Sequence, residues 1–231
     1  MCKKRKILVL VLTVMLIMGM GHSLYSQELL TASRYLDSVS ERYTRVEDYE
    51  ARLRIRHNDV VMEGTIFYKK PNLLRINFDR PEEQVLAVDG ERLTLFLPQH
   101  NVVMRQRLQR SEQATMVSFA SSDGLALLRR GYSVAFLEGP DFMPLEEGSD
   151  EMVRKLKLGW RSIDEGFREI ILFIDQDMLI RRIRATTAEY ETFQMDFLNI
   201  RTNRNIPASR FRFDGSPTAH NLDNFLFDPE D

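Results

Sequence analysis

The hydrophobic pattern of the chain changes several times along its length. Residues 27–49 place apolar side chains at helical spacing between charged ones, which predicts an amphipathic helix. Much of the remaining chain alternates apolar and polar residues with a period of two, and this alternation predicts β-strands with one buried face. The predicted strands cover residues 50–57, 63–70, 73–79, 85–88, 93–97, 101–106, 132–137, 153–160, 167–174, 178–187, 190–198 and 209–213.

The middle of the chain interrupts the strands. Residues 111–120 and 124–131 return to helical spacing, and Ser111 and Asp123 are the predicted N-caps of these two helices. Residues 138–151 contain two prolines among many acids, which predicts a solvated loop. Together these patterns predict an α+β fold in which helices meet a meandering antiparallel sheet.

Two of the predicted strands, 85–88 and 93–97, are apolar at nearly every position. The strand before them is different, because Leu74, Ile76 and Phe78 alternate with polar residues. A strand that is covered on both faces reads as a continuous apolar run, so packing alone explains the pattern. Alternatively, one face of a curled, incomplete barrel stays apolar in order to hold a hydrophobic ligand. Periodicity leaves both explanations open.

The first residues have the order of a secretory signal peptide. Basic residues 3–6 precede an apolar run over residues 7–20, and small and polar residues follow. The run is shorter than the roughly 20 residues that a bilayer span needs. We therefore expect a cleavable signal peptide over residues 1–26 and one exported domain over residues 27–231, with an uncleaved anchor as the alternative. The single cysteine, Cys2, precedes the apolar run and so cannot be the acylated cysteine of a lipoprotein signal.

The charge of the chain argues against nucleic-acid binding. The whole chain has 32 basic and 34 acidic residues, and removal of residues 1–26 takes away four basic ones. The expected mature chain then carries 28 basic and 34 acidic residues, a net charge of −6. Binding to a phosphate backbone needs clustered Lys and Arg, so we expect no nucleic-acid partner. The mature chain has no cysteine for a disulfide.

No pattern of catalytic residues stands out. His57, His100 and His220 are single and far apart, without metal-ligand spacing between them. The chain contains no Gly-x-Ser-x-Gly motif and no glycine-rich phosphate loop, and its acids lie mainly in turns and on polar faces. We therefore expect no enzyme, no catalytic residue, no metal site and no cofactor.

Three segments carry a resemblance to a known family. The longest reads GTIFYKKPNLLRINFDRPEEQVLAVDGERLTLFLP (residues 64–98), and the later ones read LFIDQDMLIRRIRA and FQMDFLNIRTNRNIPASRFRFDGSP. Together they resemble the outer-membrane lipoprotein carrier family, LolA, over most of residues 28–217. The landmarks that follow the family's order are Gly64, Pro71-Asn72, Pro81, Asp89-Gly90, Pro98 and Phe211-x-Phe213.

The resemblance implies a half-open, incomplete antiparallel β-barrel with helices forming a lid over an apolar cavity. Acyl chains would then lie against one face of the sheet, and the other face would pack, which explains the strands that are apolar on both sides. The residues that we expect to line this acyl-chain cavity are Leu74, Ile76, Phe78, Leu86, Leu95, Phe193, Met195 and Phe197.

The resemblance also implies a lid and a latch. We expect Phe119, Leu125, Leu127 and Leu128 to belong to the lid and to face the strand that carries Ile76. In the best-studied branch of the family, an arginine before Pro-Asn holds the lid shut, but this chain has Lys70 at that position. Lysine lacks the planar guanidinium group that binds two acceptors at once. Lys70 is therefore a candidate for the latch, and the alternative is that it is an ordinary solvated cation at a strand end.

Such carriers receive acylated lipoproteins from an inner-membrane ABC transporter and deliver them to an acceptor at the outer membrane. The resemblance therefore implies a monomeric periplasmic shuttle with these partners. The alternative is a periplasmic protein on the same half-barrel that binds a lipid or glycolipid or senses the state of the envelope.

Overall fold

The computed structural model describes residues 30–108, 121–163, 165–213 and 215–225. The chain divides into two compact units, Met1–Leu30 and Thr31–Asp231. Every described helix and strand lies in the second unit, so this unit contains both the sheet and the helices that pack on it. The predicted signal peptide and the predicted helix 111–120 lie outside the described residues.

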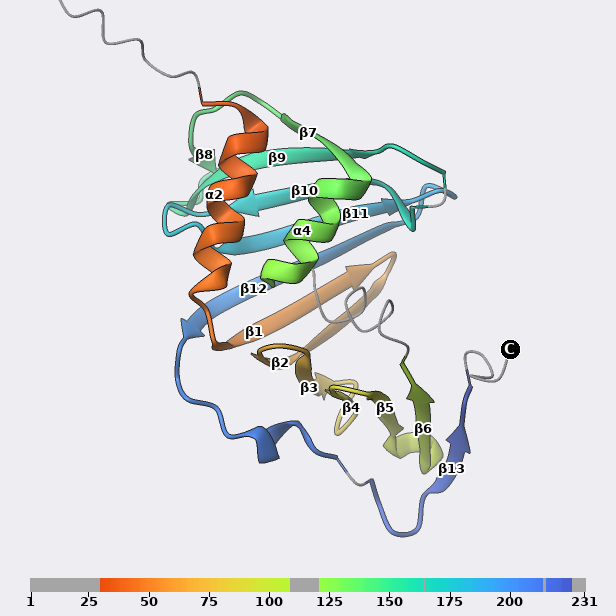
Figure 1. Cartoon of the computed structure of the whole chain (residues 1–231). Helices are drawn as coiled ribbons and strands as arrows, with labels where there is room; N and C mark the ends of the chain where they lie inside the picture. The colour runs from red at the N-terminus through yellow and green to blue at the C-terminus, as the bar shows by residue number, and fades with distance from the viewer. Residues whose placement is uncertain (1–29, 109–120, 164, 214, 226–231) are drawn as a thin grey trace, which may run out of the picture. The chain divides into compact units, whose positions relative to one another are not determined.

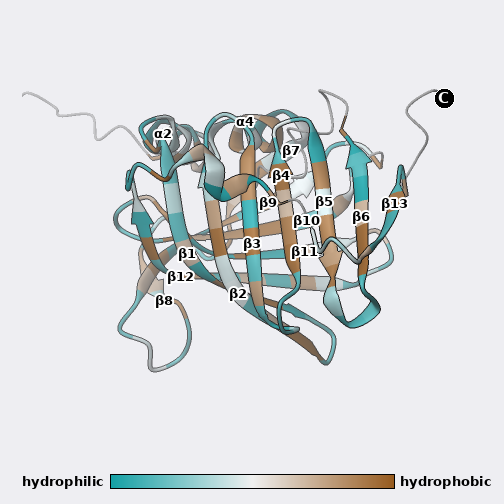
Figure 2. Ribbon diagram, turned by 90° about the horizontal axis from the view of Figure 1, so that it is seen from below, coloured by the Kyte–Doolittle hydropathy of each residue, from teal (hydrophilic) through white to brown (hydrophobic). Residues whose placement is uncertain are grey.

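The described strands form one sheet that does not close. Their order is β13-β6-β5-β4-β3-β2-β1-β12-β11-β10-β9-β7, with the short β8 paired to β9 off this path. Neighbouring strands are antiparallel, except for β13 beside β6. Figure 2 shows β1 to β6 in front of β9 to β12 and running across them, so the sheet bends back on itself where β1 meets β12. An unclosed antiparallel sheet with few helices confirms the predicted α+β class.

Period-two alternation placed almost every strand within a few residues. The strands are β1 (Asp48–His57), β2 (Val60–Lys69), β3 (Leu73–Arg80), β4 (Val85–Asp89), β5 (Arg92–Leu97), β6 (Val102–Arg107), β7 (Tyr132–Phe136), β8 (Met143–Pro144), β9 (Met152–Trp160), β10 (Phe167–Ile174), β11 (Ile180–Thr187), β12 (Thr192–Thr202) and β13 (His220–Asp223). Two short 3₁₀ helices, η1 (Pro98–His100) and η2 (Ala208–Phe211), complete the described chain with helices α2 (Ala32–Thr44) and α4 (Ser122–Gly131).

The predicted strand over residues 209–213 is wrong, because η2 occupies most of this range. Pro207 precedes η2 and has no amide hydrogen for a sheet ladder. Phe211 and Phe213 are two residues apart and therefore look like one face of a strand. Phe211 is buried, and Phe213 packs on Phe96 with ring centres 5.4 Å apart. The last strand is instead β13, which pairs in parallel with β6.

Both helices begin later or with a different cap than predicted. The hydroxyl of Thr31 accepts a hydrogen bond from the amide of Arg34 (3.2 Å), so α2 begins at Ala32 rather than near residue 27. Ser121, not Asp123, caps α4, because its hydroxyl accepts from the amide of Gly124 at 3.2 Å. Asp123 lies in the first turn, where a negative charge interacts favourably with the helix dipole.

The two helices cover one side of the sheet, which we call the inner face. Figure 1 shows α2 and α4 side by side over β9 to β12. The helices are joined by an ion pair between Arg129 and Asp37 at 3.0 Å. Apolar residues at helical spacing on α2 enter the core, and these are Ala32, Tyr35, Leu36, Val39 and Tyr43.

The C-terminal strap, residues 203–225, covers the opposite, outer face of β3 to β6 (Figure 1). It is held at its start by the buried carboxylate of Asp48, which accepts hydrogen bonds from the amides of Arg204 (2.7 Å) and Ile206 (3.0 Å). Further along, the guanidinium of Arg75 donates to two strap carbonyls, those of Arg210 (3.1 Å) and Arg212 (2.9 Å).

The strap explains why β4 and β5 are apolar on both sides. On β4, Val85 and Ala87 point to the outer face and are buried, while Val88 is buried on the inner face. Double coverage is therefore the cause of the continuous apolar pattern on β4. The packing explanation that the sequence left open therefore accounts for the buried outer-face residues of β4.

Residues 138–151 are more than a solvated loop. Glu146 and Glu151 pair with Arg182 (2.5 Å) and Arg181 on β11, and Glu138 pairs with Lys155 (3.1 Å) on β9. Apolar residues of the same region, Leu137 and Leu145, pack against a small second core of Val153, Ile171 and Phe173. The acids of this loop therefore fix it to the outer face of β9 to β11.

Candidate functional site

The inner face of β3 to β5 is a continuous apolar surface. Leu74, Ile76 and Phe78 share this face because they are two residues apart, and all three are buried in the main core. Ile76 lies opposite Leu86 of β4, and Leu86 lies opposite Leu95 of β5. Leu86 and Leu95 are only half-buried. The register therefore brings all five predicted residues of this half of the sheet onto one face.

The predicted residues of β12 lie on the same inner face. Phe197, Met195 and Phe193 are opposite Leu53, Ile55 and His57 of β1, respectively. Burial falls along this series, because Phe197 is buried, while Met195 and Phe193 are half-buried. The ring of Phe193 stacks on the imidazole of His57, with centres 4.0 Å apart and planes 4° from parallel. All eight predicted cavity residues therefore share the inner face.

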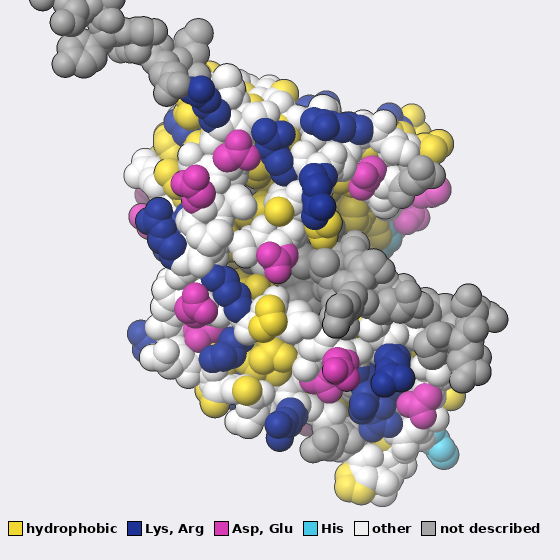
Figure 3. All heavy atoms as spheres, in the orientation of Figure 1, with side chains coloured by type: hydrophobic (Ala, Val, Ile, Leu, Met, Phe, Trp, Pro, Cys, Tyr) yellow, Lys and Arg dark blue, Asp and Glu magenta, His cyan; other side chains and the backbone are white. Residues whose placement is uncertain are grey.

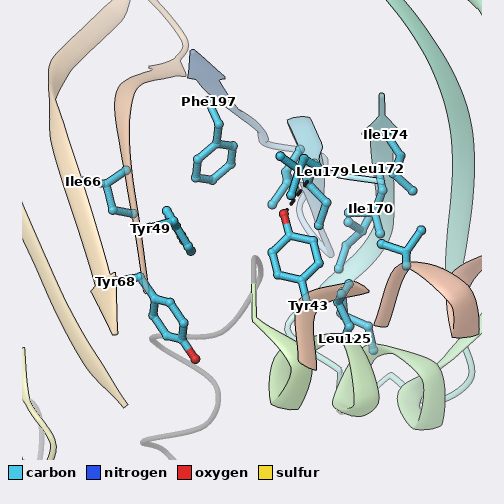
Figure 4. Packing of buried hydrophobic residues seen from close by; sticks show 14 of the residues in the cluster. Tyr43, Tyr49, Ile66, Tyr68, Leu125, Ile170, Leu172, Ile174, Leu179 and Phe197 are labelled. Atoms are coloured by element: carbon cyan, nitrogen blue, oxygen red, sulfur yellow. Dashed lines mark hydrogen bonds between the residues drawn. The ribbon is translucent and has the colours of Figure 1, made fainter. Parts of the chain in front are cut away.

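Period-two reasoning from single strands missed several inner-face residues. Tyr49 and Tyr68 lie opposite each other on β1 and β2, with ring centres 5.2 Å apart, and Tyr43 reaches the sheet from α2. Figure 4 shows Tyr49, Ile66 and Tyr68 on one side of the core and Tyr43, Leu125 and Ile170 on the other. Extension of the phase of Leu74 across the register of neighbouring strands would have found Tyr49 and Tyr68.

The predicted lid residues that the structure describes lie on α4. Leu125 and Leu128 are buried and Leu127 is half-buried, whereas Phe119 lies outside the described residues. From the family resemblance we expected this helix to face Ile76 of β3. In the structure α4 lies over β10 to β12, and Figure 4 shows Leu125 on the side of Ile170. The start of α4 is tied to β2, because the hydroxyl of Tyr68 is hydrogen-bonded to Ser121.

Lys70 binds the end of α2 rather than α4. Its ammonium group donates a hydrogen bond to the carbonyl of Thr44, the last residue of α2, and lies 3.3 Å from a carboxylate oxygen of Glu47. A cation at a helix C-terminus interacts favourably with the carbonyls and the dipole there. Since α2 packs on α4, Lys70 connects the β2–β3 turn to the helix pair.

Three of the family landmarks have local physical causes. A Cβ on Gly64 would lie 2.3 Å from the carbonyl oxygen of Asn77 on β3, so only glycine allows β2 and β3 to approach there. Gly90 has a φ of +105°, which favours glycine, and its carbonyl accepts a hydrogen bond from the side chain of Asn72 at 2.8 Å. The Pro-Asn and Asp-Gly landmarks are therefore two sides of one contact.

The interior is closed at the end of the sheet that lies under α2. A pocket there has a volume of about 10 Å³ and is lined by Tyr43, Val46, Tyr49, Leu179, Ile180, Phe197, Ile200 and Thr202. That volume has room for about one water molecule. Small-molecule pockets have about 300–1,000 Å³, so an acyl chain would reach this end of the interior only if its side chains moved.

Burial controls the ionisation of the tyrosines in this interior. It raises the pKa of Tyr68 to about 12, although the hydrogen bond to Ser121 acts in the opposite direction. Burial also raises the pKa of Tyr43 and of Tyr49 above the usual value of 10.0. The hydroxyl of Tyr43 accepts a hydrogen bond from the amide of Ile180 at 3.1 Å. These three phenol groups therefore stay uncharged in the folded protein to a higher pH than in the unfolded chain.

Within the described ranges, no three His, Cys, Asp or Glu side chains are grouped as metal ligands. Neither α2 nor α4 has the length and apolar character of a membrane-spanning helix, and the same holds for the rest of the described chain. The apolar inner face is thus the feature that the sequence and the structure both single out.

Comparison with known proteins decides the family. The sequence profile of the outer membrane lipoprotein carrier protein LolA matches residues 55–214, which is more than half of the chain. The chain belongs to the LolA family. The matched range includes β2 to β12, and with them every predicted cavity residue. It ends at the strap, just after Phe211 and Phe213.

Individual relatives are distant. The outer-membrane lipoprotein carrier proteins of Pseudomonas paraeruginosa and Pseudomonas aeruginosa are each 25% identical over 157 residues, which cover 67% of this chain and 68% of each relative. An uncharacterized conserved protein from Thermus thermophilus has the same fold, with a TM-score of 0.54 at 13% identity over 83% of this chain and 98% of that one. The family is therefore established, and the cargo of this member is a separate question.

Proposed function

We propose that this LolA-family protein carries acylated lipoproteins through the periplasm and holds their acyl chains between the inner face of the sheet and the helices α2 and α4. The observation that carries the proposal is the inner face itself. Eight predicted residues from β3, β4, β5 and β12 lie on it, and two of the four half-buried ones, Leu86 and Met195, pack against the buried core. Such a surface gains free energy when acyl chains cover it.

The tight packing of the interior beneath α2 fits a carrier that must also release its cargo. Burial of acyl chains contributes about 0.8 kcal/mol per methylene, so three chains of about 16 carbons would give some tens of kcal/mol. This exceeds the strongest non-covalent affinities, which end at about 20 kcal/mol. Contacts that the empty protein makes with itself, and loses on loading, offset this gain. The packing of Leu125 and Leu128 and the bond from Lys70 to α2 are contacts of this kind.

The remaining parts of the proposal follow from the family. Residues 1–26 act as a cleavable signal peptide, and residues 27–231 form a single monomeric carrier domain in the periplasm. An inner-membrane ABC transporter loads the protein at the expense of ATP, and an outer-membrane acceptor receives the cargo. The protein acts by binding, without a catalytic residue, a metal or a cofactor.

The proposal is tested by capture of cargo from membranes. Residues 27–231 are incubated with inner-membrane vesicles that carry a labelled triacylated lipoprotein, with and without ATP, and soluble protein is separated by size. We expect a one-to-one complex that forms only with ATP. A soluble protein that holds no lipoprotein under any condition would contradict the proposal.

A matched pair of variants tests the face. Leu95 and Phe96 are neighbours on β5, both half-buried, and point to opposite faces. Leu95→Gln places an amide on the inner face and should reduce capture about tenfold, because loss of about 1.4 kcal/mol of apolar contact has this effect. Phe96→Gln changes the outer face beneath the strap and should leave capture within about twofold. We choose Leu95 over Phe78, since a polar group at the buried Phe78 would also unfold the core.

The same preparation tests the alternative function. Phospholipid or glycolipid that copurifies with the protein, without ATP-dependent capture of lipoprotein, would identify a lipid-binding or envelope-sensing protein on the same half-barrel.

A further inference from the structure

Three neighbouring hairpins place large apolar residues in solvent at one edge of the sheet. Val60 follows the β1–β2 turn and is 57% exposed, Tyr190 lies in the β11–β12 turn and is 72% exposed, and Ile163 lies in the β9–β10 turn and is 78% exposed. In the sheet these hairpins are consecutive, in the order β2-β1, β12-β11, β10-β9. Strands are spaced by about 4.8 Å, so adjacent tips are about 10 Å apart. We call these three residues the apolar rim.

The figures place these turns at the same edge. Figure 1 shows the turns at the right-hand ends of β9 to β12 and of β1 and β2. Figure 3, in the same orientation, shows hydrophobic side chains at the edge where β9 to β12 end. The next two hairpins along this edge differ. The β3–β4 turn contains Glu82 and Glu83, and the β5–β6 turn contains His100. The apolar rim therefore occupies one part of the edge and not all of it.

The apolar rim continues into the inner face. On β12 the side chains change from the buried Phe197 to the half-buried Met195 and Phe193 as the strand nears the rim. On β2 they change in the same direction from the buried Ile66 through the half-buried Met62 to Val60. The opposite end is tightly packed beneath α2, so the less buried part of the inner face lies toward the rim.

Tyr190 is held in place by a cation. The guanidinium carbon of Arg168 lies 3.9 Å from the centre of the Tyr190 ring and 5.7 Å from that of Trp160. Aromatic rings with a polar atom and arginines with apolar stems are the side chains that suit a membrane–water interface. The stack therefore keeps an interfacial side chain pointed outward.

The charges at the three turns restrict the kind of membrane. The turns carry Asp59, Glu165, Glu189 and Glu191 but only Arg161 as a described cation, with Arg168 beside them on β10. An acidic edge is repelled by an anionic lipid surface and is tolerated by a zwitterionic one. The apolar side chains also stand on separate convex tips, which a fluid lipid interface accommodates without a matching pocket for each.

We propose that the apolar rim of Val60, Ile163 and Tyr190 contacts the headgroup–acyl boundary of a zwitterionic phospholipid bilayer and brings the less buried end of the inner face to the membrane. The purpose of this contact rests on the proposed function, because acyl chains that enter the inner face start in a membrane. The contact itself does not depend on lipoprotein and is therefore measured without it.

The single tryptophan of the chain reports on this contact. Trp160 lies at the end of β9, beside Arg168, and no other tryptophan competes with its fluorescence. Residues 27–231, which include the compact unit with all described elements, are mixed with phosphatidylcholine vesicles whose chains are brominated near the headgroup. We expect quenching of Trp160, weaker quenching when the bromines lie near the bilayer centre, and weaker binding to vesicles with added phosphatidylglycerol.

Two variants separate the rim from general surface hydrophobicity. The triple variant Val60→Ser, Ile163→Ser, Tyr190→Ser should bind vesicles at least about tenfold more weakly, since each exposed residue contributes apolar area at the interface. Leu222→Ser, on β13 at the far end of the sheet order, removes a side chain that is 50% exposed and should bind like the unchanged protein. All substituted positions are exposed, so thermal unfolding should stay the same.

Absence of quenching by shallow bromines, or equal binding by the triple variant, would overturn the membrane contact. Capture of a lipoprotein released in detergent distinguishes this from failure of the proposed function. If the contact alone is wrong, the protein still captures detergent-released lipoprotein. If the carrier function is wrong, the protein captures lipoprotein neither from inner-membrane vesicles nor from detergent, whether or not the bromines quench Trp160.

Discussion

Lys70 shows how one side chain can connect a turn to the helix layer. The family resemblance led us to expect an arginine-like latch on the lid, and the structure places the ammonium group of Lys70 on the carbonyl of Thr44 at the end of α2. A point charge suits a single helix end, whereas a guanidinium fork suits two fixed acceptors. The coupling to α4 is indirect and passes through the pair of Asp37 and Arg129.

At this scale we predict that Lys70→Met loosens the helices. The free energy of unfolding should fall by about 1–2 kcal/mol, because a charged hydrogen bond to the backbone is lost. The affinity for a fluorescent fatty-acid probe should rise, since less contact energy opposes loading. Chemical denaturation and probe titration measure these two quantities.

Lys69→Met is the matched control for Lys70→Met. Lys69 donates a hydrogen bond to the carbonyl of Ile206 at 2.7 Å, so it secures the strap instead of α2. Its removal should also lower stability but should leave probe affinity unchanged. Equal gains in probe affinity for both variants would show that Lys70 has no special connection to the helices.

The pairing of β2 with β3 is the element on which the inner face depends. The register shifts between Glu63 and Gly64, and beyond this point Ile66 and Ile76 lie opposite each other on the inner face. A one-residue slip would send the apolar side chains of β3 to the outer face. Gly64 stabilises the register because the backbone of β3 occupies the space of its missing Cβ.

We predict that Gly64→Ala lowers the free energy of unfolding by about 2–3 kcal/mol, as overpacking of a tight contact does. Gly166→Ala is the control, because a Cβ there meets nothing within 4 Å, and it should change stability by less than about 0.5 kcal/mol. Urea denaturation of the two variants checks both values. Similar stability of the two would contradict the close approach of β2 and β3.

The molecule as a whole keeps several phenol groups neutral inside its core, and three of them lie on or against the inner face. Burial raises the pKa of Tyr43, Tyr49 and Tyr68 above the usual value of 10.0, and for Tyr68 to about 12. In the unfolded chain these groups lose their protons near pH 10, while the folded chain keeps them. Unfolding therefore releases protons above pH 10, and stability falls as the pH rises from there to the folded-state pKa.

We predict a decline of about 1.4 kcal/mol per pH unit for each of these tyrosines above about pH 10. Tyr68→Phe removes one titrating group and should reduce the slope by about 1.4 kcal/mol per pH unit, although it also loses the hydrogen bonds to Ser121 and to the carbonyl of Pro71 at every pH. Denaturation curves from about pH 8 to about pH 11 give the slope. A slope that Tyr68→Phe leaves unchanged would mean that Tyr68 does not titrate on unfolding.

The sequence was sufficient for structure that depends on local periodicity and insufficient where contacts are long-range. The prediction for β10 matches residues 167–174, because its alternation is clear. Residues 209–213 of the strap were predicted as a strand, because Phe211 and Phe213 have the spacing of one strand face. Pro207 and the hydrogen bond from Ile206 to Asp48 instead determine the conformation there.

For the candidate site, period-two alternation placed Leu74, Ile76 and Phe78 on one face of β3. It could not show that Tyr68 meets Ser121 or that α4 lies over β10 to β12. These facts depend on how the sheet bends at β1 and β12, and no local pattern encodes that bend.

The most direct test of the central claim locates an acyl chain on the sheet. A photoreactive benzoylphenylalanine replaces Leu95, which is half-buried on the inner face, or Phe96, which is half-buried on the outer face. Each protein is loaded with a lipoprotein that carries radiolabelled acyl chains and is then illuminated. We expect crosslinks to the acyl chains from position 95 and none from position 96. Equal crosslinking from both positions, or crosslinks from position 96 alone, would contradict binding of acyl chains at the inner face.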